Sequence, residues 1–246
     1  MVGNNVRPIQ EDEFRYVVCI LKDNPRASWE DNILCSGTLI SSHHILTVEH
    51  CFATVDVQTK VVVTIGGQNF DNGLRHYPTW WVSFHQWTVG QGQEFLSGIH
   101  DILIVRIFGK PRNNEPCLMG YVYPVTIING EDLTVVGCTK INDGDTHTLL
   151  ATATVHILDR AYCQQKVSND YGYPIIVDEQ YICSFNDPYT LIEYGDSGGP
   201  LLRHGVLVGI NIARCPTMDT AIHPAQVNIH LSLHLYQNYL CTVSTE

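Results

Sequence analysis

The stretch from Glu193 to Leu201 constrains this chain more than any other. It reads E-Y-G-D-S-G-G-P-L, so Ser197 sits among glycines that let a tight turn present both its hydroxyl and its backbone N–H. That arrangement suits a nucleophile beside an oxyanion hole. A bare S-G-G would equally fit a Gly-rich hairpin turn. The full G-D-S-G-G-P string is far more specific and favours the nucleophile.

Two further motifs belong with this loop: His50 stands in T-V-E-H-C (residues 47–51), and Asp101 opens D-I-L-I-V-R (residues 101–106). Together with Ser197 they resemble the chymotrypsin-like serine proteases, and the order His50, Asp101, Ser197 is that family's order. The resemblance implies that Ser197 attacks a carbonyl, His50 takes its proton, and Asp101 holds the imidazole. The N–H groups of Gly195 and Ser197 would form the oxyanion hole.

The resemblance covers the whole chain and implies an all-β fold of two antiparallel six-stranded β-barrels with a C-terminal α-helix, in a single domain over residues 1–246. Short β-branched runs such as 33–40 and 60–65, separated by turn residues, independently favour antiparallel strands. The expected parts are an N-terminal barrel over about 14–109, a crossover over about 110–124, a C-terminal barrel over about 125–230 and a helix over about 231–241.

The charge balance limits the possible partners. Lys plus Arg number 14 against 25 for Asp plus Glu, a formal charge of -11, which repels phosphate backbones and anionic lipid. We therefore expect neither nucleic acid nor a membrane as partner. We also expect no cofactor and no metal, because the twelve histidines repeat no ligand spacing. The expected form is a secreted, extracellular monomer whose signal and propeptide are absent from the sequence, since no signal-like leader follows Met1.

Nine cysteines indicate disulfides formed in an oxidising compartment, and an odd count leaves at least one thiol over. The resemblance implies the pairs Cys35–Cys51, beside His50, and Cys163–Cys183. Further candidate pairs are Cys19–Cys138 and Cys117–Cys241. Cys215 lacks its usual family partner, because Glu193 occupies that position.

The first residues, M-V-G-N, stand where the family has a mature N-terminus. In the family the α-amino group inserts and pairs with the aspartate before the catalytic serine, here Asp196. A methionine amine can still reach Asp196, although its longer side chain must fit the same pocket.

Several supporting residues depart from the family pattern. Glu49 replaces an alanine beside His50, and a second carboxylate near Asp101 would raise the cost of keeping both ionised. The alternative is that Glu49 points to solvent. The family's S-W-G segment becomes Ile212-Ala213-Arg214. Ile212 has no hydroxyl to donate to Asp101, and Arg214 brings a long cation to the strand that would bind the substrate backbone.

The primary pocket is also altered. Leu191 stands where the trypsin-like branch has the aspartate that binds Lys or Arg, so trypsin-like specificity is excluded. Glu193 replaces a disulfide cysteine, and an ion pair with Arg214 is the candidate substitute. Tyr194 can swing over the pocket mouth.

The chain as a whole resembles the mite group 3 allergen type of these proteases, and the altered pocket resembles the scabies mite inactivated protease paralogues. That resemblance implies a protein with little or no proteolytic activity that binds host proteins, complement components among them, and takes part in immune evasion. The alternative is an active secreted serine endopeptidase with non-tryptic specificity that acts on peptide substrates. The intact His50, Asp101 and Ser197 keep this alternative open.

Overall fold

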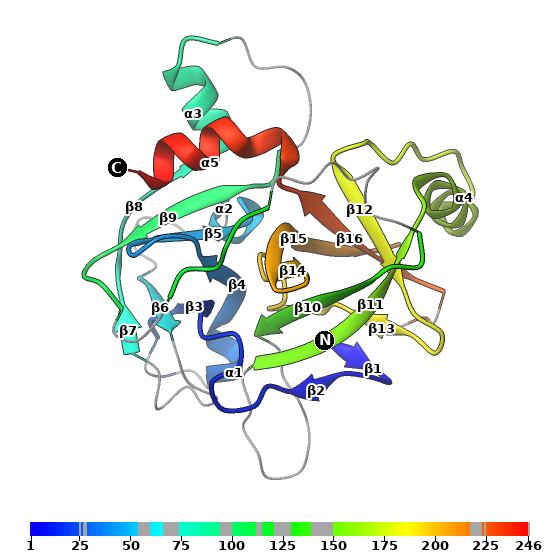
Figure 1. The fold of residues 1–246 in the computed structure, drawn as a ribbon, viewed down its shortest axis with the longest axis horizontal. Helices are drawn as coiled ribbons and strands as arrows, with labels where there is room; N and C mark the ends of the chain where they lie inside the picture. The colour runs from blue at the N-terminus through cyan, green and yellow to red at the C-terminus, as the bar shows by residue number, and fades with distance from the viewer. Residues whose placement is uncertain are drawn as a thin grey trace.

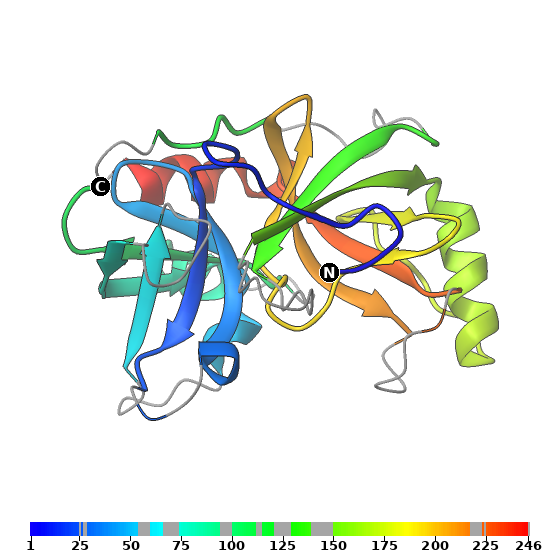
Figure 2. The same ribbon diagram turned by 90° about the horizontal axis from the view of Figure 1, so that it is seen from below.

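The computed structural model describes residues 1–24, 26, 29–53, 60–65, 74–93, 100–111, 115–120, 129–138, 150–216, 223 and 225–245. Two curved antiparallel sheets lie side by side, with the C-terminal helix across one end of the first (Figures 1 and 2). The sequence-based expectation of an all-β, two-barrel fold with a C-terminal helix is confirmed.

The first sheet has the strand order β7-β6-β3-β4-β5-β9-β8. Its strands are β3 (Val17–Lys22), β4 (Ile33–Leu39), β5 (His44–Thr47), β6 (Val61–Ile65), β7 (Leu74–His76), β8 (Pro78–Ser83) and β9 (Leu103–Ile107). Within the described residues no ladder joins β7 to β8, so this sheet is a curled half-barrel where a closed barrel was expected. Only Tyr77 separates the two strands, which leaves no room for a hairpin turn between them.

The second sheet closes into a six-stranded barrel, because β10 pairs with both β14 and β11. The order is β10-β14-β15-β16-β12-β11, with β2 (Arg7–Pro8) added to β11. Its strands are β10 (Asp132–Cys138), β11 (Leu150–Leu158), β12 (Tyr181–Phe185), β14 (Pro200–Arg203), β15 (Val206–Cys215) and β16 (Val227–Ser232). The short strands β1 (Val2–Gly3) and β13 (Thr190–Leu191) form a separate pair. Much of the expected crossover, residues 112–114 and 121–128, lies outside the described residues.

The helices are few and short: α1 (Trp29–Asn32), α2 (His50–Ala53), α3 (Phe84–Gly90), α4 (Arg160–Tyr171), the 3₁₀ turn η3 (His234–Tyr236) and α5 (Gln237–Ser244). Asp159 caps α4 by accepting from the N–H of Tyr162 at 2.9 Å. The C-terminal helix starts at Gln237, later than the expected 231, because Leu231 pairs with Tyr181 and Ile210 inside the barrel. On α5, Tyr239 packs against Phe84 and Trp87 of α3, and its hydroxyl donates to Val82 O on β8 at 2.7 Å, which anchors the helix to the first sheet. No helix of the described part is long and apolar enough to cross a membrane.

Strand β4 runs through the junction of the two sheets, and all seven of its residues are buried. Three disulfides, Cys19–Cys138, Cys35–Cys51 and Cys163–Cys183, are present as expected. The first of them joins β3 to β10 and so links the two halves covalently. The candidate bridge Cys117–Cys241 is wrong: Cys117 is buried and hydrogen-bonded to Tyr16, whereas Cys241 lies on the exposed side of α5.

A buried polar network runs through the second barrel. His230, fully buried on β16, bonds Ser184 through Nε2 at 2.9 Å and Asn211 through Nδ1 at 2.9 Å. Asn211 accepts at its Oδ1, so Nδ1 of His230 carries the proton and Nε2 accepts from the Ser184 hydroxyl. Burial lowers the pKa of His230 to about 3, so the imidazole is neutral at physiological pH.

We predict that this histidine makes the fold acid-sensitive. Its folded-state pKa of about 3 lies below the ordinary value of 6.5. Between these two values the histidine of the unfolded chain is protonated while that of the folded chain stays neutral, so lowering the pH favours unfolding. The free energy of unfolding should therefore fall by about 3 kcal/mol more between pH 7 and pH 4 in the wild type than in His230→Gln. Urea unfolding of both proteins at several pH values measures this difference. Parallel pH dependences would contradict the prediction.

Candidate active site

His50 begins α2, three residues after β5 ends at Thr47, and two hydrogen bonds orient it toward Asp101. Its backbone N donates to Asp101 Oδ1 at 2.9 Å, and its ring Nδ1 lies 2.6 Å from Oδ2. Asp101 is buried, while the side chain of His50 is 47% exposed. Because Nδ1 faces the carboxylate, Nε2 is the ring nitrogen that can take a proton.

Glu49 is half-buried, and its charge acts on Tyr239 of the C-terminal helix. The pKa of the Tyr239 hydroxyl is raised mainly by burial, and the nearby charge of Glu49 adds to the shift. Asp101 instead acts on Tyr181 and Tyr236, whose pKa values it helps burial to raise. The two carboxylates therefore have different neighbours, and Asp101 keeps both hydrogen bonds to His50.

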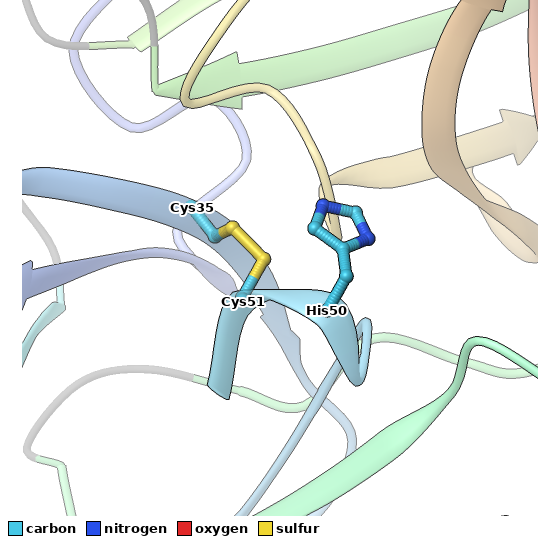
Figure 3. A group of neighbouring side chains, drawn as sticks. All are labelled: Cys35, His50 and Cys51. Atoms are coloured by element: carbon cyan, nitrogen blue, oxygen red, sulfur yellow. A yellow bond between two sulfur atoms is a disulfide. The ribbon is translucent and has the colours of Figure 1, made fainter. Parts of the chain in front are cut away.

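A ring nitrogen of His50 lies within 4.8 Å of the sulfurs of Cys35 and Cys51 (Figure 3). Cysteine binds metals as a thiolate, but these two sulfurs are bonded to each other. The group is therefore a disulfide that braces the histidine turn, and its donor set does not fit a metal ion.

Ser197 lies on the turn between β13 and β14, half-buried, and its hydroxyl donates to the backbone oxygen of Ile212 at 3.1 Å. That oxygen is available because β15 carries a bulge: Asn211 pairs with His230 and Ala213 with Ile229, which leaves Ile212 as the extra residue. Within the described part of the chain no hydrogen bond joins Ser197 to His50. The structure thus brings His50 and Asp101 together and directs the Ser197 proton elsewhere.

The backbone of the nucleophile loop is arranged as an oxyanion hole requires. Gly195 has φ +96°, and a Cβ there would lie 2.4 Å from the carbonyl oxygen of Cys138, so only glycine fits. Its own carbonyl accepts from the Ser36 hydroxyl at 2.7 Å, and the carbonyl of Ser197 accepts from the Ser36 N–H at 2.8 Å. Among the described residues, neither the N–H of Gly195 nor that of Ser197 has an acceptor, so both can receive an oxyanion.

A buried ion pair involving Asp196, the residue before Ser197, holds the nucleophile loop in place. The α-amino group of Met1 lies 2.5 Å from Asp196 Oδ2, and both side chains are fully inaccessible to solvent. Burial lowers the pKa of the amine and raises that of the carboxyl, and in each case the partner's charge opposes the shift. The same carboxylate accepts from the N–H of Glu193 at 2.8 Å. The pair Met1–Asp196 therefore ties the first residue to the turn that precedes Ser197.

The residues expected to alter the substrate pocket lie on two sides of Ser197. Leu191 is fully buried and pairs with Val2. Arg214, on β15 beyond Ile212 and Ala213, forms an ion pair with Glu193. The guanidinium is only 15% exposed, and burial lowers its pKa. Tyr194 is 71% exposed.

Two participants were not foreseen from the sequence: the Ile212 carbonyl and the Ser36 hydroxyl. A backbone oxygen carries no side-chain signal, and a bulge is not visible in the residue types of β15. Ser36 had a signal, since a polar residue inside the buried run I-L-C-S-G-T-L needs a partner.

Comparisons with known proteins agree with this geometry. Residues 4–230 match the family model described as Trypsin. Trypsin iota of Drosophila melanogaster is 28% identical over 183 residues, covering 72% of this chain and 66% of the relative. A venom serine protease of Polistes dominula is 24% identical over 228 residues, covering 88% of this chain and 72% of the relative. In structure, mouse neuropsin superposes with a TM-score of 0.74 at 18% identity, over 97% of this chain and 98% of neuropsin.

We predict that Asp196→Asn destabilises the fold strongly. The neutral amide would leave the Met1 ammonium buried without a counter-charge, at a cost of about 3–5 kcal/mol in the free energy of unfolding. Asp170→Asn makes the same chemical change on the exposed side of α4 and should leave stability within about 0.5 kcal/mol of wild type. Chemical denaturation of the three proteins at one pH gives the comparison. Equal stabilities of the two variants would mean that the ion pair contributes nothing.

Proposed function

The chain belongs to the trypsin family of serine proteases, and on that premise we propose that it is a secreted family member that binds proteins and cleaves peptides weakly or not at all. The observation that carries this proposal is the ion pair between Glu193 and Arg214 on the strand that would receive the substrate backbone. Arg214 occupies a place where the family has glycine, and its partner holds it there. Disulfides and the absence of a membrane-spanning helix from the described residues support secretion.

The chemistry around Ser197 supports low turnover for a second reason. Its hydroxyl donates to Ile212 O, so the proton must be redirected to His50 before Ser197 can attack. The Ile212 side chain also has no hydroxyl to donate to Asp101, and a hydrogen bond to a charged group contributes about 1.5–3 kcal/mol. Docking and activation are thus both impaired, although each triad residue is present.

Host proteins, complement components among them, are the proposed binding partners, in line with the resemblance to the inactivated mite paralogues. The large negative charge, -11, favours partners with basic surfaces. Binding that survives Ser197→Ala would separate this role from catalysis.

A second candidate function is an active endopeptidase with non-tryptic specificity. Three observations favour it: the His50–Asp101 hydrogen bonds, the Met1–Asp196 ion pair, and the N–H groups of Gly195 and Ser197 that remain available to an oxyanion. With Leu191 buried near the pocket, such an enzyme would prefer an apolar side chain at the cleavage position.

We predict that Ser197 reacts with a small fluorophosphonate while peptide hydrolysis stays near background. The small probe needs His50 and the oxyanion donors but little docking, whereas a peptide must lie along Ile212–Arg214. Labelling of wild type and Ser197→Ala, with hydrolysis of peptides carrying Arg, Phe, Leu or Ala at the cleavage position, tests both parts. Robust turnover of one of these peptides, abolished in Ser197→Ala, would favour the active endopeptidase.

We predict that removing the ion pair between Glu193 and Arg214 improves the binding of peptide substrates beside Ser197. The double variant Glu193→Ala/Arg214→Gly removes both charges of the pair together. We expect hydrolysis of an apolar-site peptide to rise at least about tenfold, because positioning contributes several powers of ten to such reactions. The matched control is Glu131→Ala/Arg203→Ala, which removes an ion pair of 2.7 Å at the far end of β14. An unchanged rate, with fluorophosphonate labelling preserved, would show that the pair does not limit docking.

A further inference from the structure

Ser36 lies where the two halves of the molecule meet, and its hydroxyl and its backbone N–H both bond across that junction. On β4 it is fully buried and pairs with Cys19 of β3. Its hydroxyl donates to Gly195 O at 2.7 Å and accepts from the N–H of Cys138 at 2.7 Å. One side chain therefore bridges the first sheet, the second barrel and the nucleophile loop.

The backbone of Ser36 makes two more buried hydrogen bonds, one across the junction and one within the first sheet. Its N–H donates to Ser197 O at 2.8 Å, and its carbonyl accepts from the Thr47 hydroxyl at 2.8 Å. Thr47 is the last residue of β5, three residues before His50. A short ladder of buried hydrogen bonds thus connects the strand that carries the histidine to the loop that carries the nucleophile.

These contacts hold two loop carbonyls, those of Gly195 and Ser197, on the inner side of the loop. Each carbonyl shares a rigid peptide plane with the N–H of the following residue, so Ser36 fixes the peptides Gly195–Asp196 and Ser197–Gly198. These two peptides flank the N–H groups of Gly195 and Ser197, which have no acceptor among the described residues. Gly195 has no Cβ and lies at a positive φ, so its own sterics restrain the direction of its carbonyl only weakly. The Ser36 hydroxyl supplies the missing constraint.

We propose that Ser36 is a positioning residue that keeps the oxyanion donors of Gly195 and Ser197 directed at the reacting centre. The inference rests on the proposed role of Ser197 as a nucleophile, and it names the residue that orients the groups around it. In Ser36→Ala, the N–H of Cys138 and the carbonyl of Gly195 both lose their buried partner. A reoriented Gly195 peptide is the simplest way to satisfy that carbonyl again.

The test compares Ser36→Ala with Thr152→Val, a variant that also loses one buried hydroxyl. Thr152 is buried on β11 and donates to Val135 O at 3.0 Å, with no contact to the nucleophile loop. Amide hydrogen exchange reports the loop directly, through the N–H groups of Gly198 and Gly199 that donate to Asn211 O and Asp196 O. We expect exchange at these two amides to be about tenfold faster in Ser36→Ala and unchanged in Thr152→Val. Unchanged exchange in Ser36→Ala, or equal acceleration in both variants, would overturn the proposal.

Fluorophosphonate labelling of Ser197 adds a readout that general destabilisation does not move. The rate should fall about tenfold in Ser36→Ala at every pH, with the midpoint of its pH profile unchanged, because the His50–Asp101 pair is untouched. A shifted midpoint, or a rate equal to that of Thr152→Val, would contradict a positioning role. Failure of the wild type to label would refute the proposed reactivity of Ser197, while the exchange measurement would still decide the role of Ser36.

Discussion

A carboxylate with no access to water stays ionised only where a cation or hydrogen-bond donors lie beside it, and Asp196 is buried in this way. The Met1 amine meets this need, so the loop that carries Ser197 and the first residues of the chain must form together. The pairing of β1 with β13 holds the amine in place, and the N–H of Glu193 satisfies the same oxygen. This charge pair ties the loop that carries the Gly195 and Ser197 amides to the first residue of the chain.

Much of the fold could be predicted from the sequence, because each family motif combines a residue type with a physical requirement. Gly195 is needed where β10 approaches closely, and Cys35 and Cys51 flank the histidine turn. The first residue of the C-terminal helix α5 could not be predicted. An apolar residue such as Leu231 suits a barrel strand as well as a helix face, and only the partners Tyr181 and Ile210 decide between them. The predicted bridge Cys117–Cys241 was wrong for a similar reason, because the number of cysteines does not show where their side chains lie.

In the candidate site, too, some features could be predicted from the sequence and others could not. The ion pair of Glu193 and Arg214 could be anticipated, because two opposite charges replace a lost covalent link. The hydrogen bond from Ser197 to Ile212 could not, since it depends on a bulge that turns one carbonyl out of its ladder. The chemistry of the side chains can therefore be predicted from the sequence, whereas the orientation of a single peptide group can be determined only from the three-dimensional structure.

The disulfide between Cys19 and Cys138 closes a covalent ring with a sequence separation of 119. Every peptide bond between residues 19 and 138 belongs to this ring, including the segment that connects the two halves. A digestive enzyme that cuts any one of these bonds opens the ring without releasing a fragment. The nicked protein stays in one piece until a reductant breaks the Cys19–Cys138 disulfide.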